Sequence, residues 1–278
     1  MIHAMRERTK LDRPLLEKLA TTLKLITTTG MRNRGIDLEC CKELGITVSG
    51  TDSEETRSAS GTVEQTWALI LALSRRVVKE HENLTRPSES RGEVWQTGVA
   101  TGLKGKTLGL IGVGRLGKQV VQVGKAFGMR VMGWSPNLTK ERAEEAGVEL
   151  AGSLEELMRT SDVVSLHIIL SEKTRGMLGY KEVGWMKRTA FLINTSRGPL
   201  INGYDLLYAL TYERIAGAGL DVFDDEPLPK NHLLRTFDNV VLSPHMGYVE
   251  TPQYETWFKQ TVENAENFLD GQPIRVMQ

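Results

Sequence analysis

The chain has 278 residues, of which 40% are hydrophobic and 25% are charged. This composition is usual for a globular protein with room for two domains, and it excludes disordered and fibrous classes. Lysine and arginine together number 35, as do aspartate and glutamate, so the formal net charge of +0 provides no basic field for nucleic acid or an anionic membrane. We therefore expect a small-molecule partner.

Cysteine usage and the short apolar runs favour the cytoplasm. Cys40 and Cys41 are adjacent, and neighbouring cysteines rarely form a disulfide because the ring strains the peptide between them. The segment from Met1 to Lys10 is charged and lacks the apolar core of a signal peptide, and apolar runs such as Trp67 to Leu73 are too short to span a bilayer. We expect a cytoplasmic protein with no membrane association.

The first third of the chain predicts a small βα region followed by a helix. Strands are expected over Leu23 to Thr29 and Ile46 to Val48, with a helix over Ile36 to Leu44 between them. A second helix, from Thr62 through Val78, has apolar residues on more than one face, so it connects domains or forms a subunit contact. The polar stretch from Glu80 to Gly98 is typical of a loop.

From Gly105 onward, strands alternate with helices, which is typical of a doubly wound parallel sheet. The expected strands are Thr107 to Ile111, Arg130 to Trp134, Val163 to Ile168, Ala190 to Asn194, Ile215 to Val222 and Val240 to Ser243. The expected helices are Gly114 to Phe127, Ser153 to Arg159, Tyr204 to Leu210 and Tyr254 to Leu269. Ligands of such sheets bind outside the carboxyl ends of the strands, and we expect the functional site there.

A glycine turn follows the first of these strands. Gly112, Gly114 and Gly117 have the G-x-G-x-x-G spacing, between the apolar run Leu108 to Ile111 and the helix-compatible stretch Lys118 to Phe127. Each glycine has a physical task in a dinucleotide site: a tight turn, close approach of the pyrophosphate, and close packing of the helix on the strand. The context therefore predicts a dinucleotide-binding site.

The residue that closes the second strand leaves the choice of dinucleotide open. A carboxylate is expected there to accept the hydroxyls of the adenosine ribose, but Ser135 occupies the position. Without the carboxylate a 2′-phosphate is not repelled, and Asn137, Thr139, Lys140 or Arg142 could contact it. A serine hydroxyl could equally serve the ribose of NAD. NAD and NADP are both compatible with the sequence.

Three segments of the second half supply one arginine, one carboxylate and one histidine. They are Asn194 to Gly198, Leu220 to Pro227 and Ser243 to Gly247, and the residues Arg197, Glu226 and His245 within them each lie just past an expected strand. Reduction of a 2-oxo acid places negative charge on the carbonyl oxygen, which a protonated imidazole can quench when a carboxylate keeps it charged. Arginine adds a planar fork that matches a carboxylate. Together they predict hydride transfer to a carbonyl beside a carboxylate, and no histidine and cysteine grouping in the sequence has metal-ligand spacing.

With these motifs, the chain resembles the D-isomer-specific 2-hydroxyacid dehydrogenases, a family that includes phosphoglycerate dehydrogenase and the glyoxylate or hydroxypyruvate reductases. The resemblance runs from Leu23 to Val276 and is most specific at Gly112 to Gly117, Asn194 to Gly198, Leu220 to Pro227 and Pro244 to Gly247. It implies an α/β protein with a Rossmann-type domain and a second, smaller, flavodoxin-like substrate domain. We assign residues 76–252 to the dinucleotide-binding domain and 1–75 with 253–278 to the substrate domain.

The resemblance also implies roles for individual residues. Arg197 would bind the substrate carboxylate and carbonyl, His245 would be the acid/base, and Glu226 would orient the histidine and keep it protonated. Glu226 is favoured over Asp224 and Asp225 because it lies five residues after Asp221, the separation found in the family. The backbone amides of Gly30 and Met31 would hold the substrate carboxylate. The expected cofactor contacts are Gly112, Gly114, Arg115, Leu116, Gly117, Ser135, Thr195 and Asp221.

The beginning of the chain departs from the family pattern. The family's small domain has one further βα unit before a strand that resembles Ile2 to Thr9. The resemblance therefore implies either a start codon that is placed late or an N-terminally truncated substrate domain. Our leading hypothesis is an NAD(P)-dependent D-2-hydroxyacid dehydrogenase, active as a homodimer on a small 2-oxo or 2-hydroxy acid. The alternatives are a dinucleotide-sensing binding protein and an inactive truncated paralogue on the same fold.

Overall fold

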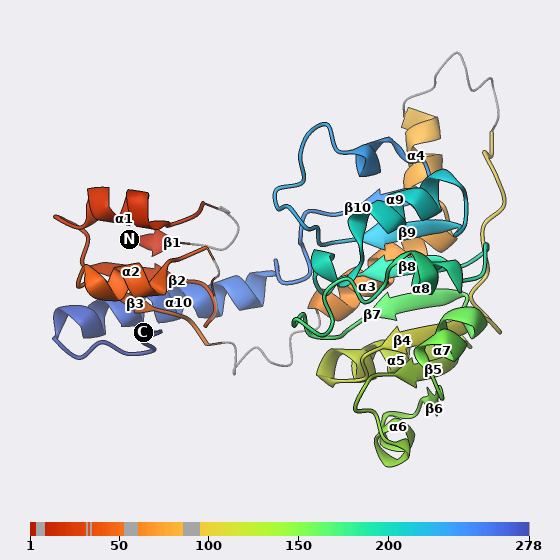
Figure 1. Cartoon of the computed structure of the whole chain (residues 1–278), viewed down its shortest axis with the longest axis horizontal. Coiled ribbons are helices and arrows are strands. Elements are labelled where there is room, and N and C mark those ends of the chain that lie inside the picture. The colour runs from red at the N-terminus through yellow and green to blue at the C-terminus, as the bar shows by residue number, and fades with distance from the viewer. Residues whose placement is uncertain (4–8, 32, 34, 53–60, 86–94, 278) are drawn as a thin grey trace. The chain divides into compact units, whose positions relative to one another are not determined.

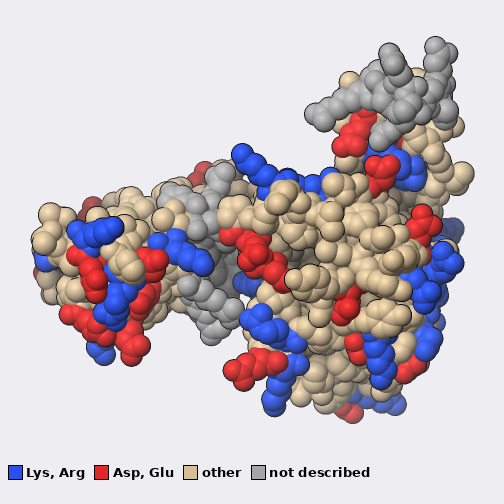
Figure 2. Space-filling model, turned by 45° about the horizontal axis from the view of Figure 1, so that its top comes forward, with Lys and Arg blue, Asp and Glu red and all other residues tan. Residues whose placement is uncertain are grey.

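The computed structural model describes residues 1–3, 9–31, 33, 35–52, 61–85 and 95–277. Contacts within the chain define two compact units, Met1–Ala59 with Val249–Gln278, and Ser60–Tyr248 (Figure 1). On the face shown in Figure 2, basic and acidic side chains are interspersed on both units. None of the helices in the described ranges is long and apolar enough to cross a membrane.

The larger unit is built on a seven-stranded sheet in which every pair of neighbours is parallel. The spatial order is β10-β9-β8-β7-β4-β5-β6. The strands are β4 (Thr107–Ile111), β5 (Arg130–Trp134), β6 (Glu149–Leu150), β7 (Val163–Leu166), β8 (Phe191–Asn194), β9 (Gly217–Leu220) and β10 (Val240–Leu242). The chain order reverses between β4 and β7, which is the switch point at which parallel sheets bind ligands.

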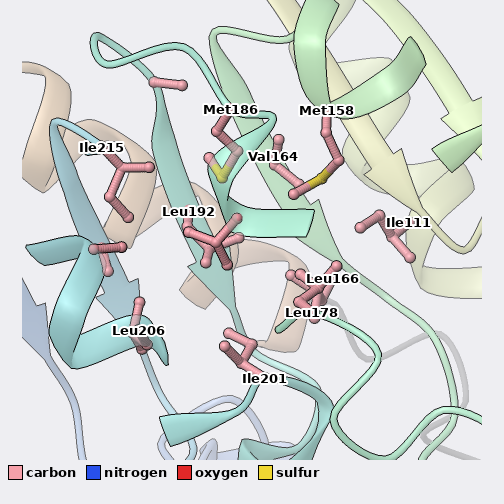
Figure 3. Packing of buried hydrophobic residues seen from close by; sticks show 14 of the residues in the cluster. Ile111, Met158, Val164, Leu166, Leu178, Met186, Leu192, Ile201, Leu206 and Ile215 are labelled. Carbon is pink, nitrogen blue, oxygen red and sulfur yellow. The ribbon is translucent and has the colours of Figure 1, made fainter. Parts of the chain in front are cut away.

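Helices cover both faces of this sheet. One face packs against α3 (Gly61–Ser74) and α5 (Arg115–Ala126), and the other against α7 (Leu154–Thr160), α8 (Tyr180–Gly184) and α9 (Gly203–Thr211). Figure 3 shows the second face, where Met158 of α7 and Leu206 of α9 lie near strand residues such as Val164 and Leu192. Burial of these apolar side chains is the main favourable contribution to folding.

The remaining elements of the larger unit are short or lie at its edges. They are α4 (Val77–Thr85), α6 (Lys140–Ala146) and the 3₁₀ turns η3 (Gly198–Leu200) and η4 (Leu233–Thr236). Helix α6 buries only Ala143. Thr139 is its N-cap residue, and the Thr139 hydroxyl accepts a hydrogen bond from the Arg142 amide. Capping therefore stabilises the start of this helix, where few side chains are buried.

The smaller unit has a three-stranded parallel sheet in the order β1-β2-β3. Its elements are β1 (Ile2–His3), α1 (Arg13–Leu19), β2 (Leu25–Thr28), α2 (Leu38–Glu43), β3 (Thr47–Ser49) and α10 (Thr251–Leu269). The two cysteines lie on α2 and are free and fully buried, packed with Leu16 and Ile26 in the core of this unit. Helix α10 returns the C-terminal part of the chain to β2.

The α/β fold with a doubly wound parallel sheet and a second, smaller parallel unit is confirmed. The predicted bounds of β4 and β5 match the structure, whereas β6, α1, α6 and α8 were not predicted. The expected loop from Glu80 was wrong in its first part, because α4 continues to Thr85. Arg76 has a φ of 59° between α3 and α4, and its Nε donates to Glu80 Oε1 at 3.2 Å, which supports the start of the second helix. Residues 86–94 of that expected loop lie outside the described residues.

The division between the units also differs from the predicted boundary at residue 75. Helix α3 was assigned to the substrate domain, but it packs on β8, β9, β10 and α5 of the larger unit. Gly219 of β9 makes this possible, because a Cβ there would lie 3.0 Å from the Cβ of Leu69. The apolar faces of α3 therefore belong to the core of the larger unit.

Candidate active site

The glycine turn between β4 and α5 is shaped by two close backbone contacts. Gly112 has a φ of 99°, and a Cβ there would lie 2.5 Å from the carbonyl oxygen of His167. A Cβ on Gly117 would lie 2.6 Å from the carbonyl oxygen of Gly112. Side chains at either position would force β4, β7 and α5 apart, so glycine is required for the turn and for the packing.

The start of α5 fits the pyrophosphate of a dinucleotide. Gly114 is the N-cap residue, has no side-chain cap hydrogen bond, and has no atom within 4 Å of the position of a Cβ. The helix begins at Arg115, so the amides of Arg115, Leu116 and Gly117 belong to its first turn. The first amides of a helix have no partner within it and point at the position that an anion occupies. The residues present thus provide both the space and the donors for the cofactor.

Ser135 directly follows β5, where the ribose of the cofactor is expected. Its carbonyl oxygen accepts a hydrogen bond from the Leu138 amide at 3.2 Å, which forms a turn before α6. Arg142 Nη1 donates to the carbonyl oxygen of Asn137 at 3.2 Å, so a cationic side chain lies beside this turn. The strand end therefore has a hydroxyl and a nearby guanidinium where a carboxylate was expected.

The three segments predicted to carry the catalytic residues follow β8, β9 and β10, which are neighbours in the sheet. In the first, Asn194 Nδ2 donates to the carbonyl oxygen of Arg197 at 2.9 Å, and the backbone amide of Ser196 donates to Asn194 Oδ1 at 3.0 Å. The Arg197 side chain is exposed, and its Nη1 donates to the carbonyl oxygen of Ser196 at 2.6 Å. Gly198 packs so closely that a Cβ would lie 2.1 Å from the carbonyl carbon of Phe223. The arginine segment is thereby fitted against the segment that carries the carboxylates.

Glu226 and His245 form a hydrogen-bonded pair. Glu226 Oε2 lies 2.7 Å from His245 Nδ1, and Glu226 Oε1 accepts a hydrogen bond from the Phe223 amide at 3.1 Å. Both side chains are 18% exposed, so the pair is largely shielded from solvent but a small molecule can still contact it. The ring of Tyr248 meets the imidazole edge to face, with centroids 5.2 Å apart. The carboxylate is fixed at both oxygens and directs the other ring nitrogen, Nε2, away from itself.

Asp224 and Asp225 are directed elsewhere. Both line a cavity of about 250 Å³ between α9 and the segment after β9, together with His232. Burial and the neighbouring Asp225 raise the pKa of Asp224. It is the carboxylate of Glu226 that the structure brings to His245, in agreement with the choice made from spacing.

Asp221 has a contact that sequence reasoning missed. Its carboxylate is fully buried and accepts hydrogen bonds from the amides of Met246 at 2.8 Å and Gly247 at 2.9 Å, and from the Ser243 hydroxyl. Asp221 therefore holds the turn that carries His245. A contact of Asp221 with the cofactor stays a prediction.

The other predicted residues are distributed over both units. Thr195 is buried, and its Oγ1 lies 2.8 Å from Thr66 Oγ1 of α3. In the smaller unit, Gly30 has a φ of 84° and its amide donates to Thr51 Oγ1 at 2.7 Å, while Met31 is 42% exposed. The structure thus defines the shape of this glycine loop, and its contact with substrate stays a prediction.

His167 is a second histidine at a strand end, after β7. Its Nε2 lies 2.9 Å from Ser165 Oγ, and burial lowers its pKa to about 4. A histidine with that pKa is neutral near pH 7. This environment disfavours a role in proton transfer.

Comparison with known proteins agrees with this geometry. Residues 67–247 match the family described as "D-isomer specific 2-hydroxyacid dehydrogenase, NAD binding domain". The chain is 41% identical over 268 residues to a glyoxylate reductase of Aeropyrum pernix, covering 94% of this chain and 76% of the relative. It is 40% identical over 245 residues to a D-3-phosphoglycerate dehydrogenase of Methanocaldococcus jannaschii, covering 87% of this chain and 45% of the relative. The crystal structure of a phosphoglycerate oxidoreductase from Vibrio cholerae superposes with a TM-score of 0.84 at 33% identity, covering 97% of this chain and 84% of that one.

Proposed function

The chain belongs to the D-isomer specific 2-hydroxyacid dehydrogenase family, and we propose that it reduces glyoxylate and related small 2-oxo acids, with Arg197 as the anion-binding residue and His245 as the proton donor. As a member of this family it is an oxidoreductase that uses a nicotinamide dinucleotide. The observation that carries the residue assignment is the 2.7 Å contact between Glu226 and His245 at the carboxyl edge of the sheet.

The arrangement accounts for the reaction in terms of charge. Reduction at C2 places negative charge on the former carbonyl oxygen, and the imidazolium of His245 delivers a proton to it from Nε2. Glu226 stabilises the charged imidazole through Nδ1 and fixes the ring orientation. In the reverse direction the neutral imidazole takes the proton from the hydroxyl of the 2-hydroxy acid.

Substrate and cofactor are held by different chemistry. The exposed guanidinium of Arg197 can bind the substrate carboxylate with two parallel hydrogen bonds. When bound at the start of α5, the nicotinamide dinucleotide supplies the hydride or accepts it in reverse. Glyoxylate is the smallest substrate of this class, and the proposal of glyoxylate is supported by the relative from Aeropyrum pernix.

We further propose that the protein accepts NADPH as well as NADH. The support is the hydroxyl of Ser135 in place of a carboxylate and the position of Arg142 beside the same turn. A carboxylate at this strand end disfavours a 2′-phosphate by charge repulsion. A hydroxyl does not.

A substrate panel tests the proposed function. Purified protein is assayed with NADH or NADPH and with glyoxylate, hydroxypyruvate, pyruvate and phenylpyruvate, at the absorbance of the reduced nicotinamide. We expect turnover with glyoxylate and hydroxypyruvate, and D-glycerate as the product from hydroxypyruvate. Binding of NADPH without turnover of any acid would favour the dinucleotide-sensing protein instead.

We also propose a homodimer formed through α4 and the segment of residues 95–99. Leu84, Trp95 and Val99 are 58%, 75% and 95% exposed. The segment is fixed to α4 because Thr97 Oγ1 donates to Glu80 Oε1 at 2.6 Å. Large apolar side chains held at a surface in this way are typical of subunit contacts. We expect the mass of a dimer by light scattering, and a monomer for Trp95→Asp; a monomeric wild-type protein would refute the proposal.

The cytoplasmic location is likewise proposed. Its support is the state of Cys40 and Cys41, which are both free and buried. Burial raises the pKa of Cys41 to about 11, so this thiol is inert near neutral pH. Free cysteines of this kind are usual in proteins of a reducing compartment.

A further inference from the structure

Three polar side chains at the start of α3 contact the segments that carry the active site. Thr62, Gln65 and Thr66 lie on one face of this helix, because residues three and four apart are neighbours on a helix. Thr62 Oγ1 donates to the carbonyl oxygen of Gly247 at 2.8 Å, and Thr66 Oγ1 lies 2.8 Å from Thr195 Oγ1. The rest of α3 is mainly apolar and packs in the core.

Gln65 is the central member of this group. Its Nε2 lies 2.7 Å from Ser243 Oγ and 3.4 Å from Asp221 Oδ1. An ionised carboxylate only accepts hydrogen bonds, so the amide nitrogen of Gln65 must be the donor. The Ser243 hydroxyl then accepts from Gln65 and donates to Asp221. The hydrogen bonds thus run in one direction, from α3 to the buried carboxylate.

Asp221 in turn binds the backbone of the turn that carries His245. The carboxylate accepts the amides of Met246 and Gly247, the two residues that follow the histidine. His245 itself has a φ of 57°, in the left-handed region that is unfavourable for a residue with a Cβ. Such a conformation persists only where surrounding contacts hold it. Among the contacts that hold it here are those of Asp221 at the backbone and of Glu226 at the side chain.

We propose that Gln65 is a positioning residue for His245, acting through Ser243 and Asp221. The proposal rests on the proposed role of His245 as proton donor. Removing the Gln65 amide leaves the buried Asp221 carboxylate with fewer donors, and a buried charged group that lacks donors is unfavourable. The turn of His245 would then open more often, and the proton donor would be out of place for a larger fraction of the time.

The main test compares Gln65→Leu with Gln122→Leu, a matched change at an exposed glutamine on α5. Both proteins are assayed with NADPH and glyoxylate, and amide hydrogen exchange is measured at Met246 and Gly247 in the full chain. For Gln65→Leu we expect kcat to fall about tenfold and exchange at these two amides to rise about tenfold, which is the size of effect that one lost hydrogen bond produces. The dissociation constant of NADPH should be unchanged, and Gln122→Leu should behave as the wild type.

Gln65→Glu provides a second readout that a purely structural role would not alter. An ionised glutamate cannot donate to Asp221 and repels it, whereas a protonated glutamate can donate through its O–H. The ratio of the variant's kcat to that of the wild type should therefore rise as the pH falls. The leucine variant should show a ratio that does not change with pH.

The outcomes separate this proposal from the proposed function. If the amides of Met246 and Gly247 exchange at the same rate in Gln65→Leu as in the wild type, the positioning role is overturned. It is also overturned if the enzyme is active and the ratio of the kcat of Gln65→Glu to that of the wild type stays constant with pH. If the wild-type protein turns over no 2-oxo acid, the proposed function fails, while the exchange measurement still decides whether Gln65 holds the turn.

Discussion

The two turns of the candidate site that have a positive φ are stabilised in different ways. The glycine turn has Gly112 at φ 99°, and the turn after β10 has His245 at φ 57°. Glycine reaches this region without steric cost, whereas histidine does not. The glycine turn is therefore stable through its own sequence and through the absence of side chains at Gly112 and Gly117.

The turn of His245 depends on residues that are distant in the sequence. Gln65, Asp221 and Glu226 reach it from α3 and from the segment after β9. The glycine turn is thus specified locally, whereas the turn of His245, the proposed proton donor, is specified by tertiary contacts. Changes at the two turns should accordingly affect different measurements.

The largest effect is expected for the imidazole itself. His245→Gln keeps a side chain that can hydrogen-bond but cannot deliver a proton, so kcat with glyoxylate should fall by roughly 10²–10⁴-fold, the usual contribution of general acid catalysis. NADPH binding, measured by fluorescence, should remain. A kcat close to that of the wild type would remove His245 from the chemistry.

The glycine turn should show the opposite pattern. Gly112→Ala places a Cβ against the His167 carbonyl oxygen, so we expect a loss of about 2–4 kcal/mol in the free energy of unfolding and a large loss of NADPH affinity. Gly128→Ala is a matched control, because Gly128 also has a positive φ, of 72°, but the atom nearest to a Cβ there is Cγ of the Lys104 side chain, at 3.3 Å. Equal losses of NADPH affinity in the two variants would show that the backbone contact is not what matters.

His167, whose carbonyl oxygen lies against Gly112, predicts that the free energy of unfolding depends on pH. Burial lowers the pKa of His167 to about 4, below the value of about 6.5 for an unfolded chain. The unfolded state therefore binds more protons between these pH values, and the stability that is present above pH 6.5 is lost as the pH falls toward 4, by up to about 3 kcal/mol. The free energy of unfolding in urea should differ less between pH 7 and pH 5 in His167→Asn than in the wild type. An equal difference in the two proteins would show that other groups cause the pH dependence.

A smaller effect is expected at the ribose position. Ser135→Asp restores a carboxylate at the end of β5, which repels a 2′-phosphate and accepts ribose hydroxyls. We expect kcat/KM with NADPH to fall about tenfold relative to that with NADH. The matched variant Ser135→Asn lacks the charge and should leave the ratio near the wild-type value. A similar ratio in all three proteins would place cofactor choice at other residues.

Local patterns in the sequence predicted much of this fold. The bounds of β4 and β5 could be predicted because apolar residues follow one another between turn residues. The two-residue strand β6 is exposed, and α4 buries none of its residues, so neither has the apolar periodicity on which prediction depends. The family, the dehydrogenase class and the α/β architecture are confirmed.

The candidate site was predictable to the extent that it follows strand ends and motif spacing. Arg197, Glu226 and His245 were identified in this way, and their catalytic roles stay predictions. The support from Gln65 and Asp221 could not be derived, because those contacts join residues up to 178 positions apart. The available signal was weak: Thr62, Gln65 and Thr66 form a polar face at the start of a mainly apolar helix.

The central claim is that His245 delivers the proton and that the charge of Glu226 supports it, and the activity of Glu226→Gln tests it most directly. A neutral amide still accepts the Nδ1 hydrogen bond but does not stabilise the imidazolium. We predict that kcat/KM for glyoxylate reduction falls about tenfold in the variant while the dissociation constant of NADPH is unchanged. A kcat/KM equal to that of the wild type would contradict the claim.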